Sequence, residues 1–188
     1  MKKLALLLFV ATVTCSVAIC QPEFQKHNPL LDLNLSPSHN QRINPEFNSS
    51  INPKFNWNVN PMHNDALNPI KNPTINPQSN PTLNPKLCEV LNPMFANALH
   101  PKNPVWHGTF LFDKEDKLVG FITMACQQIL LSFNTEGEWT GYYVKSSCNT
   151  YNEFTVEGTW TGKYLCPDLN EGYNLFTNEG EWTGNHIK

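Results

Sequence analysis

The C-terminal part of the chain repeats one pattern of apolar and polar positions four times. Each copy is a nine-residue phrase that begins with Phe and ends with Gly, and the copies occupy 112–120, 133–141, 154–162 and 176–184. The shared form is Phe-x-x-Glu-Gly-x-Trp-Thr-Gly, flanked by short strand-like apolar runs. The lead Phe residues are 21, 21 and 22 residues apart. A fixed period of this length predicts repeated supersecondary units that pack against their copies.

The middle of each phrase has the sequence of a β-hairpin turn. Residues 134–137 read Asn-Thr-Glu-Gly, which suits a type I turn followed by a residue at positive φ. Asp116 replaces the Gly in the first copy, and Asp tolerates that conformation. A lone hairpin is marginal in water, so the four must share a core. We therefore expect an all-β domain over 105–188, with four hairpins in pseudo-fourfold symmetry and turns at 113–116, 134–137, 155–158 and 177–180.

A second pattern, with a period of eight residues, runs through 28–104. Asn-Pro begins at 28, 44, 52, 60, 68, 76, 84 and 92, and an aliphatic residue stands before each frame position from residue 35 onwards. Asn followed by Pro favours a turn, and Pro at this spacing excludes long helices and central strands. We expect a string of turns with its aliphatic residues on one side, which Phe47, Phe55 and Trp57 would thicken. A disordered low-complexity stalk is the alternative.

Composition separates these two regions. All nine Gly lie at 108 or later, and thirteen of the fifteen Pro lie between 29 and 104. Residues 105–188 carry five Lys or Arg against eleven Asp or Glu, a net charge of 5 − 11 = −6. An acidic domain repels phosphate backbones, so nucleic-acid binding is disfavoured. We expect a repeat stalk over 21–104 followed by the hairpin domain.

Residues 1–20 have the form of a signal peptide. Lys2 and Lys3 precede an apolar run over 4–13, and 18–20 offers small residues for cleavage. The apolar run is too short to span a bilayer securely, so we expect no transmembrane segment in the mature chain. The predicted location is outside the cell, at its surface or in the periplasm, and a lipid anchor on Cys20 or Cys15 is the alternative.

Export makes disulfide bonds possible between the cysteines that remain after cleavage. Cys88, Cys126, Cys148 and Cys166 allow up to two bonds and three connectivities. Cys126 and Cys148 follow the closing Gly of adjacent copies by six and seven residues, so they hold nearly equivalent places in neighbouring hairpins. We expect a bond between these two, with Cys88 either paired to Cys166 or free.

Glu recurs in all four phrases and Trp in the last three, where the first phrase has Leu118, and both are candidates for ligand contact. Converging turn glutamates would bind a cation such as calcium, whereas splayed turns would leave them as ordinary turn residues. Repeated tryptophans would form a platform for sugars or cationic headgroups, or they would pack in the core. No arrangement typical of a catalytic site stands out, so we expect no enzymatic activity and no cofactor apart from calcium. The candidates are Glu115, Glu136, Glu157 and Glu179, and Trp139, Trp160 and Trp182.

The four phrases resemble the small four-fold beta flower domain of secreted bacterial proteins, with the likeness covering about 105–188. The octads are similar in composition to the asparagine–proline leaders of some secreted bacterial proteins. The resemblance implies an exported β domain and no established activity. We expect a display, binding or structural module whose partner is a cell-surface glycan or protein. The alternatives are a carbohydrate- or cell-wall-binding module that uses the repeated Trp, and a secreted effector-associated domain.

Overall fold

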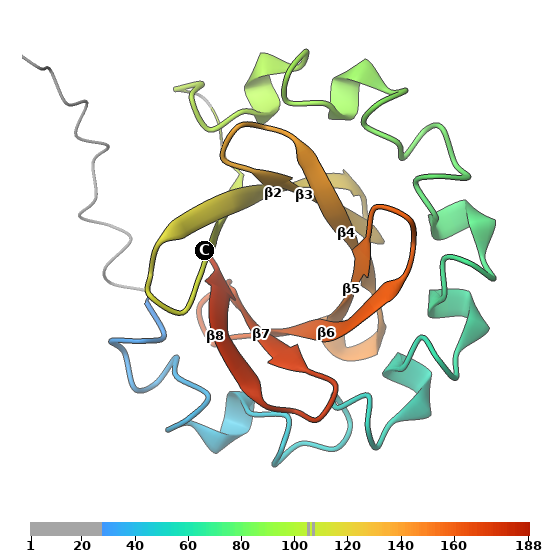
Figure 1. Ribbon diagram of the computed structural model, residues 1–188. Coiled ribbons are helices and arrows are strands. Elements are labelled where there is room, and N and C mark those ends of the chain that lie inside the picture. The colour runs from blue at the N-terminus through green and yellow to red at the C-terminus, as the bar shows by residue number, and fades with distance from the viewer. Residues whose placement is uncertain (1–27, 105, 107) are drawn as a thin grey trace, which may run out of the picture.

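The chain folds into an eight-stranded antiparallel barrel that closes in chain order, with β8 beside β1 (Figure 1). The computed structural model describes residues 28–104, 106 and 108–188, so the predicted signal peptide lies outside the described residues. The all-β prediction is confirmed. Within the described part of the chain, no helix combines the length and apolar character needed to cross a membrane. The strands are β1 (Thr109–Phe112), β2 (Leu118–Cys126), β3 (Ile129–Asn134), β4 (Trp139–Lys145), β5 (Tyr151–Thr155), β6 (Trp160–Pro167), β7 (Tyr173–Thr177) and β8 (Trp182–Ile187).

Consecutive strands form hairpins, and the turn of each hairpin lies in the middle of one repeated phrase. Gly137, Gly158 and Gly180 have φ values of 88°, 89° and 90°, and Asp116 holds the corresponding place at 61°. These residues close their turns by donating a backbone hydrogen bond to the residue three positions earlier. The four turn positions predicted from the phrases are therefore confirmed. Gly and Asp recur there because other side chains resist positive φ.

Side chains alternate between the barrel lumen and its outer face. The lumen is packed by a cluster that includes Tyr143, Leu165 and Leu175, each no more than 2% exposed. On the outer face, one aromatic ring from each even-numbered strand lies against the lead Phe of the next hairpin. These pairs are Phe121 with Phe133 at 5.5 Å, Tyr142 with Phe154 at 5.6 Å, Tyr164 with Phe176 at 5.9 Å, and His186 with Phe112 at 5.2 Å. Each hairpin thus packs against its neighbour on both faces of the sheet.

The Asn-Pro tract (28–104) is a coil of tight turns, with one turn every four residues. An Asn opens most turns, and its side-chain oxygen accepts from the backbone N–H two residues on, as Asn60 does from Met62 at 2.8 Å. The amide of Asn60 also donates to the carbonyl of Pro53 in the preceding octad at 2.9 Å. Each Asn of this kind therefore forms its own turn and ties it to the previous eight-residue coil. Several turns are short 3-10 helices: η2 (Gln41–Ile43), η3 (Trp57–Val59), η4 (Asp65–Leu67), η5 (Pro73–Ile75), η6 (Glu89–Leu91) and η7 (Asn97–Leu99), with η8 (Ser147–Asn149) between β4 and β5.

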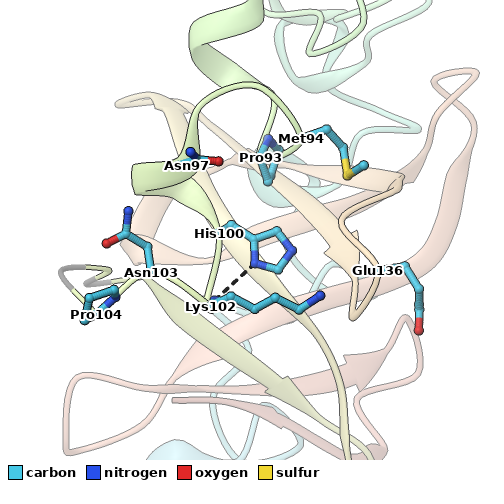
Figure 2. A pocket seen from close by; sticks show the side chains of 8 residues that line it. All are labelled: Pro93, Met94, Asn97, His100, Lys102, Asn103, Pro104 and Glu136. Carbon is cyan, nitrogen blue, oxygen red and sulfur yellow. Dashed lines mark hydrogen bonds between the residues drawn. The ribbon is translucent and has the colours of Figure 1, made fainter.

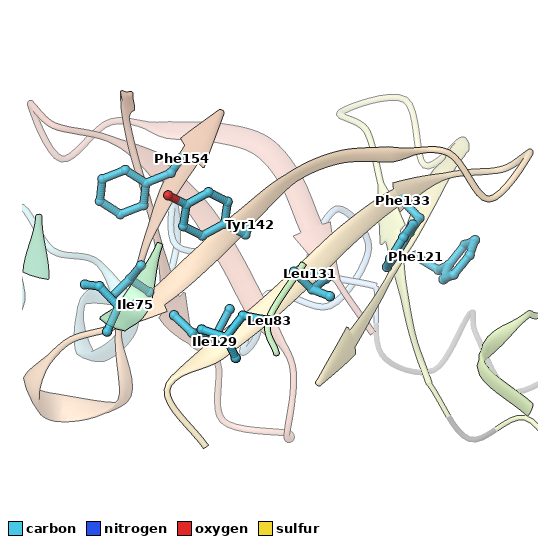
Figure 3. Close-up of a cluster of buried hydrophobic side chains, with 9 residues drawn as sticks. Ile75, Leu83, Phe121, Ile129, Leu131, Phe133, Tyr142 and Phe154 are labelled. Carbon is cyan, nitrogen blue, oxygen red and sulfur yellow. The ribbon is translucent and has the colours of Figure 1, made fainter. Parts of the chain in front are cut away.

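The tract wraps around the outside of the barrel and does not project from it as a stalk (Figure 1). Ile75 and Leu83 belong to one hydrophobic cluster with the outer face of the sheet, where Tyr142 and Phe154 lie side by side (Figure 3). Ile51 packs in a second cluster on that face. The aliphatic frame therefore faces inward, with most of its members buried. The buried members are Leu35, Ile43, Ile51, Val59, Ile75 and Leu83.

The aromatic residues of the tract lie on the opposite side from the one expected. Phe47, Phe55 and Trp57 are 59%, 61% and 67% exposed, so the expectation that they thicken the inner apolar side is wrong. Phe47 and Phe55 each stand four residues from an inward aliphatic residue. Four residues are half of an eight-residue coil, which places their side chains on its outer side.

The disulfide bond expected between Cys126 and Cys148 is absent, and both residues are exposed free thiols. Cys126 ends β2 and Cys148 lies in the separate connection between β4 and β5. The two residues therefore lie in different elements, although they follow the closing Gly of adjacent phrases at nearly equal distance in the sequence. Cys88 and Cys166 are free as well, and Cys166 is buried against the tract side of the sheet.

Candidate binding surfaces

The hairpin turns meet the tract at regular intervals. A Cβ added at Gly180 would lie 2.6 Å from the Asn52 amide nitrogen, and one added at Gly158 would lie 3.2 Å from that of Asn76. A Cβ added at Gly137 would lie 3.3 Å from the Met94 sulfur and 3.5 Å from the His100 ring. Asn52, Asn76 and His100 are 24 residues, or three octads, apart, and they meet the hairpins in reverse chain order. Successive hairpin turns therefore contact the tract at positions three coils apart.

The recurring glutamates stand one at each of the four hairpin turns, and all four are exposed. Glu179 forms an ion pair with Lys54 of the tract at 2.6 Å, and this contact raises the pKa of Lys54. Glu136 borders a hollow beside the tract. In the described part of the chain, no three His, Cys, Asp or Glu side chains are placed to hold one metal ion. The calcium site considered from the sequence is not assembled, because Glu115, Glu136, Glu157 and Glu179 occupy separate turns.

The recurring tryptophans are half-buried, and each indole is tied to its own strand. The indole N–H of Trp139 donates to the Gly141 carbonyl at 2.7 Å, and that of Trp160 donates to the Lys163 carbonyl at 3.1 Å. Trp182 makes the corresponding contact at 3.4 Å. All three rings also pack against the core clusters. Their polar edges are therefore already used, and the three indoles belong to three different strands, β4, β6 and β8.

An exposed group of rings lies instead on the outer side of the tract. We call Phe47, Phe55, Trp57 and His63 the aromatic ridge. The rings of Trp57 and His63 stack with centroids 4.8 Å apart and planes 18° apart, and the ammonium group of Lys54 lies 5.8 Å from the centre of the Phe55 ring. Aliphatic side chains continue the exposed surface at other coils. They include Leu31, Leu33, Met62, Ile70, Leu87, Val90 and Met94.

A polar hollow of about 510 Å³ separates the last coils of the tract from the second hairpin turn (Figure 2). The His100 ring lies beside the Lys102 side chain, which extends toward Glu136, and its Nδ1 accepts a hydrogen bond from the backbone N–H of Lys102 at 3.1 Å. Burial and the charge of Lys102 lower the pKa of His100, so the ring is neutral near pH 7. One cation and one anion beside a neutral imidazole suit polar contact with a ligand. The shallow hollow offers little enclosure from water.

A second, more apolar cavity of about 490 Å³ lies at the end of the barrel away from the hairpin turns. Its wall holds Tyr151 and Tyr173, whose rings meet edge to face with centroids 5.6 Å apart. Burial raises the pKa of the Tyr151 hydroxyl to about 12, so the group is neutral at physiological pH. The remaining lining residues are Ala98, Leu99, Trp106, Gly108, Thr109, Ile122, Thr123, Met124, Leu130 and Ile187.

Comparisons with protein-family models, curated proteins and solved structures found no match. Sequence reasoning missed both the aromatic ridge and the cavity. The ridge had a readable signal, because Phe47, Phe55 and His63 keep the eight-residue spacing while standing half a coil away from the aliphatic frame. The cavity had none, since it depends on how the barrel end meets the tract.

Proposed function

We propose that this protein is an exported, non-enzymatic binding module in which the barrel is the support and the outer side of the tract is the contact surface. The observation that carries the proposal is the exposure of Phe47, Phe55 and Trp57, at 59–67%, on a coil that the barrel holds in place. Soluble domains rarely leave contiguous large apolar groups exposed unless the surface binds something. Location outside the cell is part of the proposal and rests on the signal-peptide pattern of residues 1–20.

A neutral glycan fits the aromatic ridge best. Flat exposed rings offer the stacking surface that sugar rings use, and the Trp57–His63 stack holds two of them in a fixed orientation. Residues 28–104 carry five Lys or Arg against four Asp or Glu, so the surface has little net charge to select an anionic partner. The repeating octads also place contact residues at regular intervals, which suits a repetitive chain. The repeated Trp residues support the glycan alternative less well, because their indole N–H groups are already bonded within the barrel.

We also propose that the hairpins are related by a pseudo-fourfold axis, as the resemblance to the four-fold beta flower domain implies. The four equivalent aromatic pairs between neighbouring hairpins support this relation. So does the contact of successive turns with tract positions three octads apart. In this arrangement the tract is a fixed ring around the barrel, and its outer side presents one rigid surface.

The test is retention of the mature protein on insoluble cellulose, chitin and peptidoglycan, and on intact cells. The triple variant Phe47→Ser, Phe55→Ser, Trp57→Ser should lose at least about tenfold in retention, because each aromatic contact contributes roughly 0.5–1.5 kcal/mol. The control variant Met124→Ser, Leu169→Ser changes exposed apolar residues of the barrel, outside the tract, and should retain binding. Unchanged retention of the aromatic variant would contradict the proposal. Retention on cells alone, lost after protease treatment of the cells, would identify a protein partner instead.

A further inference from the structure

One position of the octad forms a continuous row on the outer side of the tract. It is the third residue after the start of each octad, and consecutive coils carry a ring or a large aliphatic group there. The row ends at Lys71, which pairs with Asp65 at 2.6 Å, and Ser79 follows at the same position of the next coil. We call this set the outer row, and all of its members are exposed. The outer row consists of Leu31, His39, Phe47, Phe55 and His63.

The outer row is curved, because the tract follows the barrel around its circumference (Figure 1). Successive hairpin turns contact the tract at positions 24 residues apart, so four hairpins correspond to a full circuit of about 96 residues. The row advances 32 residues from Leu31 to His63, which is about a third of that circuit. A flat surface such as a lipid bilayer would therefore touch only part of the row. A ligand that contacts every coil must bend with it.

The coils that carry the outer row have no net charge. Residues 28–63 contain two Lys or Arg and two Asp or Glu, a net charge of 2 − 2 = 0. Lys54 is also paired with Glu179 of the fourth hairpin turn, at 2.6 Å. A polyanion such as a nucleic acid gains its affinity from several cations that neutralise its phosphates, and this surface does not supply them. The row therefore suits an uncharged chain whose repeated units stack on the exposed rings.

Asn48 adds a hydrogen-bond donor in the middle of the outer row. The Asn at this half-octad position usually donates its side-chain amide to a carbonyl six residues earlier, as Asn64 does to Asn58 at 2.8 Å. The Asn48 amide donates to no described residue, although its oxygen accepts from the N–H and hydroxyl of Ser50. Asn48 is half-buried and directly follows Phe47 in the chain. Its amide can therefore bond to a ligand hydroxyl without breaking a contact within the tract.

We propose, on the basis of the binding function proposed above, that the outer row binds a flexible, uncharged polysaccharide lengthwise. Each coil contributes one contact, and the Asn48 amide donates a hydrogen bond to a sugar hydroxyl. β-1,3-linked glucans curve readily, whereas β-1,4-linked glucans are straight and stiff. The curvature of the row therefore selects the first kind of chain, and the number of coils sets the length of chain that is bound.

The test compares soluble β-1,3-linked and β-1,4-linked gluco-oligosaccharides of increasing length, titrated calorimetrically into the mature full-length chain. Affinity for the β-1,3 series should rise at least about tenfold with length and then level off once the row is covered, because each further ring adds a contact. Affinity for the β-1,4 series should level off at a shorter length, since a straight chain leaves the row. Affinity that does not depend on length, or that is equal for the two linkages at every length, would overturn the proposal.

Single substitutions separate the outer row from the aromatic ridge. His39→Ala lies outside the ridge and should weaken binding of the longest β-1,3 chain about threefold to tenfold, while the shortest chains bind as before. Asn48→Ala should weaken binding about fivefold to tenfold, as expected for one lost hydrogen bond. Ser79→Ala changes the same octad position beyond the end of the row and should bind as the wild type does.

The result can be distinguished from failure of the proposed function. Unchanged affinity in both His39→Ala and Asn48→Ala would overturn the outer row. If the protein were still retained on insoluble glycans or cells and the ridge variant were not, the ridge would bind through a local contact and the proposed function would stand. If retention were absent as well, both would be refuted.

Discussion

Asn152 of β5 donates a hydrogen bond from its side-chain amide to the backbone carbonyl of Val59, 93 residues earlier, over 2.9 Å. Asn174 of β7 makes the same contact with the carbonyl of Leu35 over 3.3 Å. Both Asn residues are about 1% exposed. Their partners in the tract are three octads apart, as are the tract positions that meet the hairpin turns. The barrel therefore fixes the register of the tract backbone through contacts between residues that are far apart in the sequence.

Changing Asn152 tests this link directly. Asn152→Asp keeps the shape but removes the donor and buries a carboxylate against the Val59 carbonyl, so we expect a loss of about 3–5 kcal/mol in the free energy of unfolding. Asn152→Leu should cost only about 1–2 kcal/mol, because Leu131 already holds the equivalent place in the second hairpin. Urea denaturation measures both values. The exposed Asn178→Asp serves as control, and equal effects of the two Asp variants would argue against the link.

Gly180 and Gly162 form a second matched pair. Both have positive φ, at 90° and 76°, so Ala at either position meets backbone strain of about 1–2 kcal/mol. Only at Gly180 would the added Cβ also collide with the tract, 2.6 Å from the Asn52 amide nitrogen, whereas nothing lies within 4 Å of a Cβ at Gly162. Gly180→Ala should therefore lower thermal stability clearly more than Gly162→Ala. Limited proteolysis should also show faster cleavage near residue 52 in Gly180→Ala, and identical cleavage patterns would show that the turn does not hold the tract.

The sequence predicted what depends on local chemistry. Hairpin turns followed from Gly137 and Asp116 at fixed offsets, and the all-β fold followed from the apolar runs beside them. The position of the tract depends on long-range contacts that leave no local signal, such as Asn152 reaching Val59. Phe55 points outward because it lies four residues, half a coil, from Ile51 and Val59, and its apolar character alone does not indicate its side of the coil.

Burial of His186 makes stability depend on pH. Its ring is 1% exposed, and desolvation lowers its pKa, while the Gly184 carbonyl and Asp116, 3.5 Å away, act in the opposite direction. Because the folded pKa lies below the unfolded value of about 6.5, the unfolded state binds the proton more readily. The stability that neutral His186 provides is present above pH 6.5 and is lost as pH falls from there toward the folded pKa.

Replacing His186 should flatten this dependence. His186→Phe introduces the residue found at the matching place of the first hairpin, Phe121, and preserves the stack on Phe112. We expect the free energy of unfolding to fall less between pH 7 and about pH 5 than it does in the wild type. His63→Phe alters an exposed histidine and should keep the wild-type slope. A His186→Phe slope equal to that of the wild type would show that this ring does not govern the response.

The cysteines should differ sharply in reactivity. Cys126 and Cys148 are exposed free thiols, whereas Cys166 is fully buried and burial raises the pKa of its thiol. Since the thiolate is the reactive form, Cys166 should react with Ellman's reagent only after unfolding. In the native protein the fast phase should lose two thiols per chain when Cys126→Ser and Cys148→Ser are combined, which leaves the half-buried Cys88 as the next to react. Protein purified without reductant provides the stricter test: a non-reduced peptide joining residues 126 and 148 would contradict the free thiols and restore the disulfide expected from the repeat spacing.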